Sequence, residues 1–192
     1  ELGPLEGGHS YMLEKLGAGS VLSIEANTRA YLKCLITKEV LDLKRVKFLC
    51  GNFIEYLRNT SNQYDLCIAS GVLYHMENPV ELIELVSKVA PRVMLWTHYY
   101  DRQIVSQGAT ANQFTGSKHM EHKGFSCTLY TYEYQKALDW KGFCGGVNSF
   151  SHWLSREDII ACLGFFGYQV TATADVPEHP HGPCLALVAE RR

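Results

Sequence analysis

Hydrophobic positions along the chain alternate between short continuous runs and stretches with helical spacing. The continuous runs, which predict strands, lie at 20–24, 46–50, 64–69 and 93–96. Three stretches predict helices, at 28–41, 53–57 and 78–91. Apolar residues recur there at three- and four-residue steps, or a short helical pattern follows a strand. Runs that are apolar at successive positions are typical of strands covered by helices on both faces. The pattern therefore predicts an α/β fold with a mostly parallel sheet.

Local signals place the helix ends and close the sheet. The pair Asn78-Pro79 is a favourable helix start, and Pro91 ends that helix. Residues 155–158 resemble a capping box and open a helix that ends near Gly167. The last two strands, 168–176 and 184–189, are connected without a helix, which favours an antiparallel pair at the edge of the sheet.

The segment 101–153 breaks this alternation. It has weak periodicity, many glycines and a high density of aromatic residues and histidines, and within it we predict a strand only at 129–134. A long irregular stretch inside a compact domain is usually a lid or a binding insertion. We therefore expect a single domain over 1–192 with an aromatic-rich lid or insertion at about 101–153.

Composition excludes several classes of protein. The 192 residues include 18 Lys and Arg against 20 Asp and Glu, so the net charge of −2 makes a nucleic-acid partner unlikely. We expect no membrane span, because no stretch approaches about 20 continuous apolar residues, and no signal peptide at the start. The seven cysteines form no C-x-x-C pair, which disfavours a zinc ribbon or disulfide framework and favours a reduced, cytoplasmic protein.

The loop at the start of the chain favours a cationic ligand. Ligands of open α/β sheets bind at the carboxyl ends of the strands, and this loop carries Gly3, Gly7 and the carboxylates Glu1 and Glu6. A dinucleotide pyrophosphate requires G-x-G-x-x-G without negative charge, and that spacing is absent. S-adenosylmethionine (SAM) carries a sulfonium and an ammonium and no phosphate, and it suits such a loop.

Residues after the next two strands fit the nucleoside of that ligand. Glu25 ends the run at 20–24, where an acid can accept hydrogen bonds from both ribose hydroxyls. Asn52 and Phe53 follow the run at 46–50. There, an amide can hydrogen-bond an adenine edge and an aromatic ring can lie against the base.

These residues carry a family resemblance. Glu1-x-Gly3-x-x-x-Gly7 is similar to the motif E/D-x-G-x-G-x-G of class I SAM-dependent methyltransferases, with Leu5 in place of the middle glycine. Gly51-Asn52-Phe53 is similar to their G-D-F/A motif, with Asn in place of Asp. Residues 64–76 resemble their F-D-x-V-x-x-x-x-V-L-x-H motif. Within that family the sequence resembles the bacterial methyltransferases that act on small molecules. The resemblance covers roughly residues 1–100 and 153–192.

The resemblance implies a fold and a cofactor site. It implies a Rossmann-like seven-stranded sheet in the order 3-2-1-4-5-7-6 with an antiparallel last strand. The first strand of that order would precede Glu1, so we expect it to be truncated in this sequence. The residues expected to bind SAM are Glu1, Gly3, Gly7, Glu25, Ala26, Asn52, Phe53, Ser70 and Gly71.

Histidines are the candidates for chemistry at the methyl acceptor. His98 follows the run at 93–96 on the expected acceptor side, where it can remove a proton from a hydroxyl, and His75 is the second candidate. For both, a purely packing role is the alternative. His119 and His122 form H-x-x-H, but no C-x-x-C or H-E-x-x-H supports a metal, and we predict none.

The predicted activity is methyl transfer from SAM to a small-molecule acceptor, with O-methylation favoured. An NAD(P)-dependent oxidoreductase, or a SAM-binding module without catalytic activity, is the alternative. A homo-oligomer is compatible with the sequence, which does not identify the acceptor.

Overall fold

The structure is a computed structural model that describes residues 1–143, 145–146 and 148–191. Its helices are α1 (Gly8–Lys15), α2 (Thr28–Val40), α3 (Phe53–Asn59), α4 (Pro79–Val89), α5 (Arg102–Val105) and α6 (Arg156–Phe165). Its strands are β1 (Val21–Glu25), β2 (Val46–Cys50), β3 (Cys67–Ser70), β4 (Arg92–His98), β5 (Phe114–His122), β6 (Phe125–Glu133), β7 (Phe150–Trp153), β8 (Tyr168–Val176) and β9 (Cys184–Arg191). Within the described ranges, no helix has the length and apolar character needed to cross a membrane.

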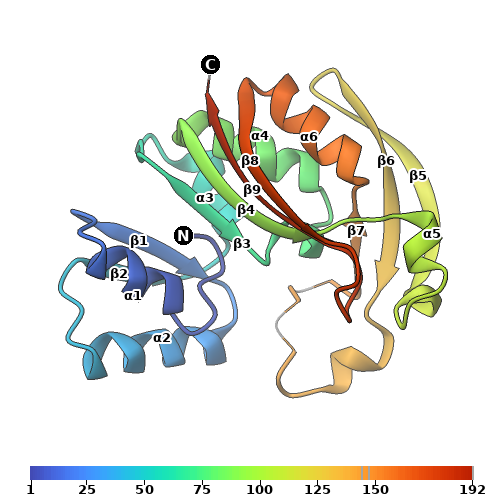
Figure 1. Cartoon of the computed structure of the whole chain (residues 1–192). Helices are drawn as coiled ribbons and strands as arrows, with labels where there is room; N and C mark the ends of the chain where they lie inside the picture. The colour runs from blue at the N-terminus through green and yellow to red at the C-terminus, as the bar shows by residue number, and fades with distance from the viewer. Residues whose placement is uncertain (144, 147, 192) are drawn as a thin grey trace.

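The strands form three sheets (Figure 1). Strands β1 and β2 pair in parallel, and a second sheet has the order β3-β4-β9-β8. In that sheet β3 and β4 are parallel, whereas β9 is antiparallel to both β4 and β8. The helix-free connection between the last two strands therefore does produce an antiparallel pair.

The first residues of the chain lie between β1 and β3 (Figure 1). The Leu2 amide donates to Ile68 O at 2.9 Å, and the Gly3 amide donates to Ile24 O at 3.0 Å. The Ile24 amide donates in turn to Glu1 O at 3.1 Å. This short segment thus links the two-stranded and four-stranded sheets, although no continuous seven-stranded sheet is present among the described residues.

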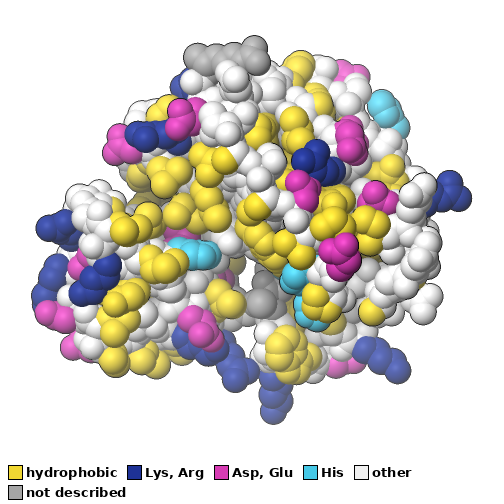
Figure 2. Space-filling view, viewed as in Figure 1, with side chains coloured by type: hydrophobic (Ala, Val, Ile, Leu, Met, Phe, Trp, Pro, Cys, Tyr) yellow, Lys and Arg dark blue, Asp and Glu magenta, His cyan; other side chains and the backbone are white. Residues whose placement is uncertain are grey.

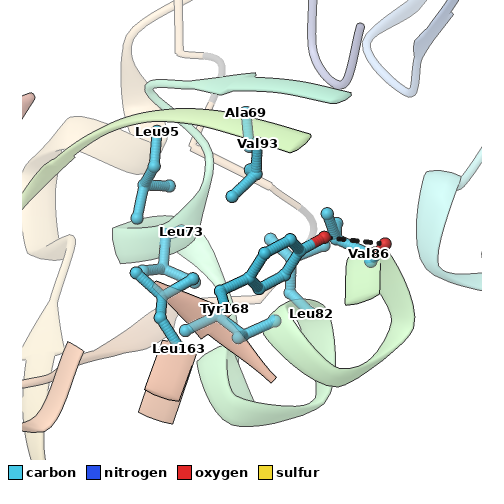
Figure 3. A pocket seen from close by; sticks show the side chains of 9 residues that line it. Ala69, Leu73, Leu82, Val86, Val93, Leu95, Leu163 and Tyr168 are labelled. Atoms are coloured by element: carbon cyan, nitrogen blue, oxygen red, sulfur yellow. Dashed lines mark hydrogen bonds between the residues drawn. The ribbon is translucent and has the colours of Figure 1, made fainter. Parts of the chain in front are cut away.

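The main core lies on the face of the β3-β4-β9-β8 sheet that α4 and α6 cover (Figure 1). Tyr168 crosses this layer among the side chains of Leu82, Leu95 and Leu163, as Figure 3 shows. Its hydroxyl donates to Ala90 O at 2.6 Å and is 3.3 Å from Val86 O. The space remaining there is about 10 Å³, close to the minimum for one water, so the layer is well packed.

The expectation of helices on both faces is wrong for this sheet. Among the described residues, no helix lies in front of β4, β9 and β8 in Figure 1, and Figure 2 shows hydrophobic side chains at the surface there. Alternate positions on that face, such as Met94 and Val188, are partly exposed. The reason is that α1 and α2 lie against β1 and β2 instead.

The apolar stripe that predicts α2 is not the face that the helix buries. Leu32, Ile36 and Val40 are 58%, 61% and 74% exposed, whereas Ala30 and Cys34 are buried against the sheet. Helical spacing identifies a stripe, but the neighbouring strands decide which stripe is covered.

The segment 101–153 is more regular than its sequence suggests. It contains the antiparallel sheet β5-β6-β7, and the strand predicted at 129–134 overlaps β6 over residues 129–133. Stacked aromatic pairs hold this sheet against β4 and the residues after it. Tyr100 stacks on Tyr130 at 3.7 Å between ring centres, and His98 of β4 stacks on Trp153 of β7 at 5.1 Å.

Six cysteines are free thiols in the structure, and five of them are buried, as expected for small hydrophobic residues. The seventh, Cys144, lies outside the described residues.

Replacing Asn78 with Ala is expected to destabilise the protein by about 1 kcal/mol, or roughly 2–4 °C in melting temperature. The Asn78 side-chain oxygen accepts from the Glu81 amide at 3.1 Å and so caps α4 ahead of Pro79. Thermal unfolding of Asn78→Ala and Asn78→Asp measures this. The aspartate keeps the acceptor oxygen and should retain stability, and equal losses in both variants would contradict the capping role.

Candidate functional site

An open cleft of about 1030 Å³ lies at the carboxyl ends of β1 and β3. Figure 2 shows the surface hollowed beside the N-terminal elements, with histidine side chains on either side of the hollow. Of the residues expected to bind a cofactor, Gly3, Glu25, Ala26, Phe53, Ser70 and Gly71 line this cleft, as does His75. Glu1, Gly7 and Asn52 are outside the lining, so the structure brings together most of the expected residues but not all of them.

The loop that leads into α1 is bent at three alternate positions. Gly3, Leu5 and Gly7 have φ values of 60°, 55° and 82°, all in the left-handed region. A Cβ on Gly3 would lie 2.6 Å from Val72 Cγ1, and one on Gly7 would lie 2.9 Å from Phe48 Cζ. Leu5 therefore adopts the conformation that the middle glycine of the family motif would take, at some cost in strain.

Glu25 is the buried acid of the cleft, with only 7% of its surface exposed. Its Oε2 accepts from the Leu5 amide at 3.0 Å, and its Oε1 accepts from the Asn27 amide at 2.8 Å. Since a carboxylate offers about four acceptor positions, each oxygen retains capacity for a ligand hydroxyl. The two backbone bonds fix the carboxylate at the wall of the cleft.

Glu1 has a supporting position beneath the loop. Its carboxylate accepts from the Ser10 hydroxyl and lies 3.1 Å from His9 Nδ1, and its side chain is 2% exposed. These contacts tie the first residues to the start of α1. Contact between Glu1 and the ligand stays a prediction, because Glu25 and Glu6 are among the described residues that line the cleft and Glu1 is not.

Asn52 and Phe53 have different structural roles. The Asn52 side chain accepts from the Ile54 amide at 2.9 Å and so caps α3, while Phe53 lines the cleft. Asn52 is not among the described residues that line the cleft, so its contact with an adenine edge stays a prediction.

Three polar residues that sequence reasoning missed also line the cleft: His9, Asn27 and Thr28. Asn27 accepts from the Arg29 and Ala30 amides and begins α2 directly after the Glu25 turn. Asn is favoured at the start of a helix, and Asn27 comes two residues after Glu25; this was the signal in the sequence that could have identified it. No Lys or Arg is among the described lining residues, while Glu6 and Glu25 are.

His98 is not among the described residues that line the cleft, and it is 5% exposed. Its Nδ1 is 2.9 Å from Gly182 O and 3.3 Å from Pro183 O. A carbonyl oxygen can only accept, so Nδ1 carries the hydrogen and Nε2 carries the lone pair. Burial lowers the pKa of His98 to about 4, which keeps the ring neutral near pH 7.

Aromatic rings surround His98. Its ring stacks on Trp153 at 5.1 Å, and it meets Trp96 at 5.1 Å and Tyr74 at 4.7 Å edge to face. Trp96 and Tyr74 also line the cleft, so His98 is one ring away from it.

His75 lines the cleft directly, and its Nδ1 is 2.7 Å from the Tyr134 hydroxyl. Burial, with a smaller contribution from His98, lowers the pKa of His75 to about 4. Both predicted histidines are thus neutral near pH 7.

The H-x-x-H pair does not converge. His119 and His122 lie three positions apart on β5, where side chains alternate between faces, so they point to opposite sides. His122 Nε2 is 2.7 Å from Glu84 Oε2, and His119 is exposed. In the described part of the chain, no three His, Cys, Asp or Glu side chains are grouped to hold a metal ion.

No protein-family model matches this sequence, and no curated protein matches it. Solved structures do resemble it. The N-terminal domain of EvdMO1, crystallised in the presence of S-adenosylhomocysteine (SAH) and D-fucose, matches with a TM-score of 0.70 and 19% identity over 99% of this chain and 73% of that one. Magnesium protoporphyrin IX methyltransferase from Synechocystis PCC 6803 with bound SAH matches with a TM-score of 0.65 and 17% identity, over 100% and 72%. A SAM-dependent methyltransferase assigned in Listeria monocytogenes matches with a TM-score of 0.68 and 13% identity, over 100% and 89%.

The chain therefore has the fold of class I SAM-dependent methyltransferases. The fold agrees with the resemblance of the sequence motifs.

Proposed function

We propose that this protein is a SAM-dependent methyltransferase that acts on a small-molecule acceptor, with O-methylation as the favoured reaction. The observation that carries the proposal is the cleft at the carboxyl ends of β1 and β3. It has a glycine-rich bend on one side, a fixed acid at Glu25 and no Lys or Arg among its described lining residues. A dinucleotide pyrophosphate would meet Glu6 and Glu25 there without a compensating cation, whereas the charge of SAM is complementary.

The residues present fit SAM. The cleft volume of about 1030 Å³ is at the upper end of the range for small-molecule sites. Glu25 retains acceptor capacity for two ribose hydroxyls, and Phe53 supplies an apolar wall for the base. The Gly3 and Gly71 backbones, both at positive φ, bring main-chain groups to the cleft without side chains in the way.

When bound, SAM supplies an activated methyl group on a sulfonium. The protein then has to orient the acceptor, exclude water and take up a proton. The rings of Trp96 and Tyr74 line the cleft and pack against His98, whose Nε2 is the unprotonated nitrogen. We assign His98 as the base for a hydroxyl acceptor and His75 as its reserve.

A small-molecule acceptor is supported by two neighbours. One was crystallised in the presence of D-fucose, and another is named for magnesium protoporphyrin IX. We also propose that residues 1–3 belong to the central strand of the order 3-2-1-4-5-7-6, since they hydrogen-bond to both β1 and β3.

Isothermal titration calorimetry tests the cofactor proposal. We expect the protein to bind SAH and SAM with micromolar affinity and to show no heat with NAD or NADP. Binding of NAD without SAH binding would instead support the oxidoreductase alternative. Tight SAH binding without methyl transfer across a broad panel of hydroxyl, amine and thiol acceptors would support a non-catalytic module.

A further inference from the structure

The hairpin that connects β8 and β9, residues 177–183, brings a second imidazole to His98. The rings of His179 and His98 are 5.1 Å apart between centres, and the ring of His179 is 6.0 Å from Trp96. His179 was not among the residues expected to act at the acceptor, and its sequence neighbourhood of prolines suggested only a connection.

The same hairpin fixes the hydrogen on each ring. The His181 amide is 3.2 Å from His179 Nδ1 and can only donate, so Nδ1 of His179 is an acceptor and its hydrogen is on Nε2. His98 has the opposite form, because Gly182 O and Pro183 O accept from its Nδ1. Within the described residues, no hydrogen bond occupies Nε2 of either ring.

We propose that His179 and His98 together bind the hydroxyl group of the methyl acceptor, with His179 Nε2 donating to its oxygen and His98 Nε2 accepting its proton. This rests on the proposed methyltransferase function and extends it to a second residue. One oxygen bonded to both nitrogens keeps them within about 5.6 Å of each other, which adjacent rings can satisfy.

The pair lies between two cavities. On one side, the rings of Trp96 and Tyr74 pack against His98 and also line the cofactor cleft. On the other, His179 lines a cavity of about 530 Å³ between the segment 103–110 and the β8–β9 hairpin. The body of the acceptor would occupy this second cavity, with its hydroxyl directed toward the cleft.

The lining of the second cavity indicates an uncharged acceptor. Its polar side chains include Gln103, Gln107 and Thr110, and Glu178 is its charged residue. No Lys or Arg is among the described residues that line it. A phosphorylated or carboxylated acceptor would therefore find no cation, and a neutral hydroxyl compound fits best.

The proposed step is balanced in atoms and charge. The acceptor oxygen forms a bond to the methyl carbon as the carbon–sulfur bond breaks with its electron pair remaining on sulfur. The hydroxyl proton passes to His98 Nε2. The positive charge thus moves from the sulfonium to the imidazolium of His98, whose Nδ1 hydrogen already donates to two carbonyl oxygens. The proton then leaves to water.

Nuclear magnetic resonance of the imidazole nitrogens tests the first part. Long-range proton–nitrogen correlation spectra of the protein should show the Nδ1–H form for His98 and the Nε2–H form for His179. Assignment of His179 as Nδ1–H would overturn the proposal, because no donor would then face the hydroxyl.

A hydroxyl probe tests the second part. Phenol titrated into the SAH-bound protein should shift Nε2 of both histidines, whereas anisole, which lacks the hydroxyl hydrogen, should not shift His98 Nε2. In His179→Phe the affinity for phenol should fall about five- to tenfold, as expected for one lost hydrogen bond. His179→Gln, which offers an amide donor, should keep most of the affinity, and His181→Gln should leave it unchanged.

Unchanged phenol affinity in His179→Phe, or phenol shifts that spare both rings, would overturn the paired role. The calorimetric affinity for SAH separates this outcome from failure of the proposed function. His179 is not part of the cofactor cleft, so all three variants should bind SAH as the unmodified protein does. If the unmodified protein does not bind SAH, the methyltransferase proposal is refuted. The position of the hydrogen on each imidazole ring can still be measured in that case.

Discussion

Glu25→Gln is expected to weaken the affinity for SAH by about 100-fold. Charge-assisted hydrogen bonds contribute about 1.5–3 kcal/mol, and 2.7 kcal/mol corresponds to a factor of 100. The substitution removes the negative charge, and it also places an NH₂ group against the Leu5 amide or the Asn27 amide, both of which donate to the carboxylate. The calorimetric dissociation constants of the two proteins measure the effect.

Glu6→Gln is the matched control for this variant. Glu6 also lines the cleft, but its side chain is 58% exposed and pairs with Lys33. Its replacement should change SAH affinity less than threefold, since exposed ion pairs contribute little. Similar losses in both variants would indicate a general effect of charge in the cleft rather than a specific contact at Glu25.

Lowering the pH from about 6.5 to 4 is expected to reduce the free energy of unfolding, because of His75 and His98. Burial lowers the pKa of each ring to about 4, while an unfolded chain has histidines near 6.5. Between these values the unfolded state binds protons that the folded state does not, so stability falls as the pH decreases. The loss amounts to roughly 3 kcal/mol per ring, a large part of a typical 5–15 kcal/mol.

Urea unfolding at pH 7.5, 6, 5 and 4.5 measures this dependence. His98→Gln should reduce the slope of stability against pH between 6.5 and 4.5 by about one proton, whereas replacing the exposed His119 with Gln should not reduce it. The carboxylate of Asp175 acts mainly at lower pH, because its hydrogen bonds with Arg156 hold its pKa below the usual value. A stability that is constant between pH 6.5 and 4.5 would show that the two rings are not buried as neutral groups.

Much of the fold could be predicted from local signals. The start of α4 at Asn78-Pro79, the strand at 46–50 and the antiparallel end of the sheet were correct because each depends on neighbours in the chain. Strands β5 and β7 and helix α1 were missed. Their sequences are rich in Gly, Ser and His, and β5 is mostly exposed, so neither alternation nor helical spacing marks them.

Part of the candidate site could also be predicted from the sequence, and part of it could not. Glu25 and Phe53 were found because they directly follow strands whose carboxyl ends form one edge of a sheet. Neither the capping bond of Asn52 nor the covered position of Glu1 could be foreseen. Each depends on which backbone or hydroxyl donor the folded chain brings next to the side chain.

The sequence by itself determined the α/β class, the acid at the end of β1 and the pair of candidate histidines, because strand-end position and residue chemistry are local properties. Only the tertiary structure decided that Leu5 adopts the left-handed bend, that Trp96 and Tyr74 line the cleft beside His98, and that the ring of His179 lies next to that of His98. These features depend on contacts between residues far apart in the chain, and packing and backbone hydrogen bonds set them rather than any spacing along the sequence.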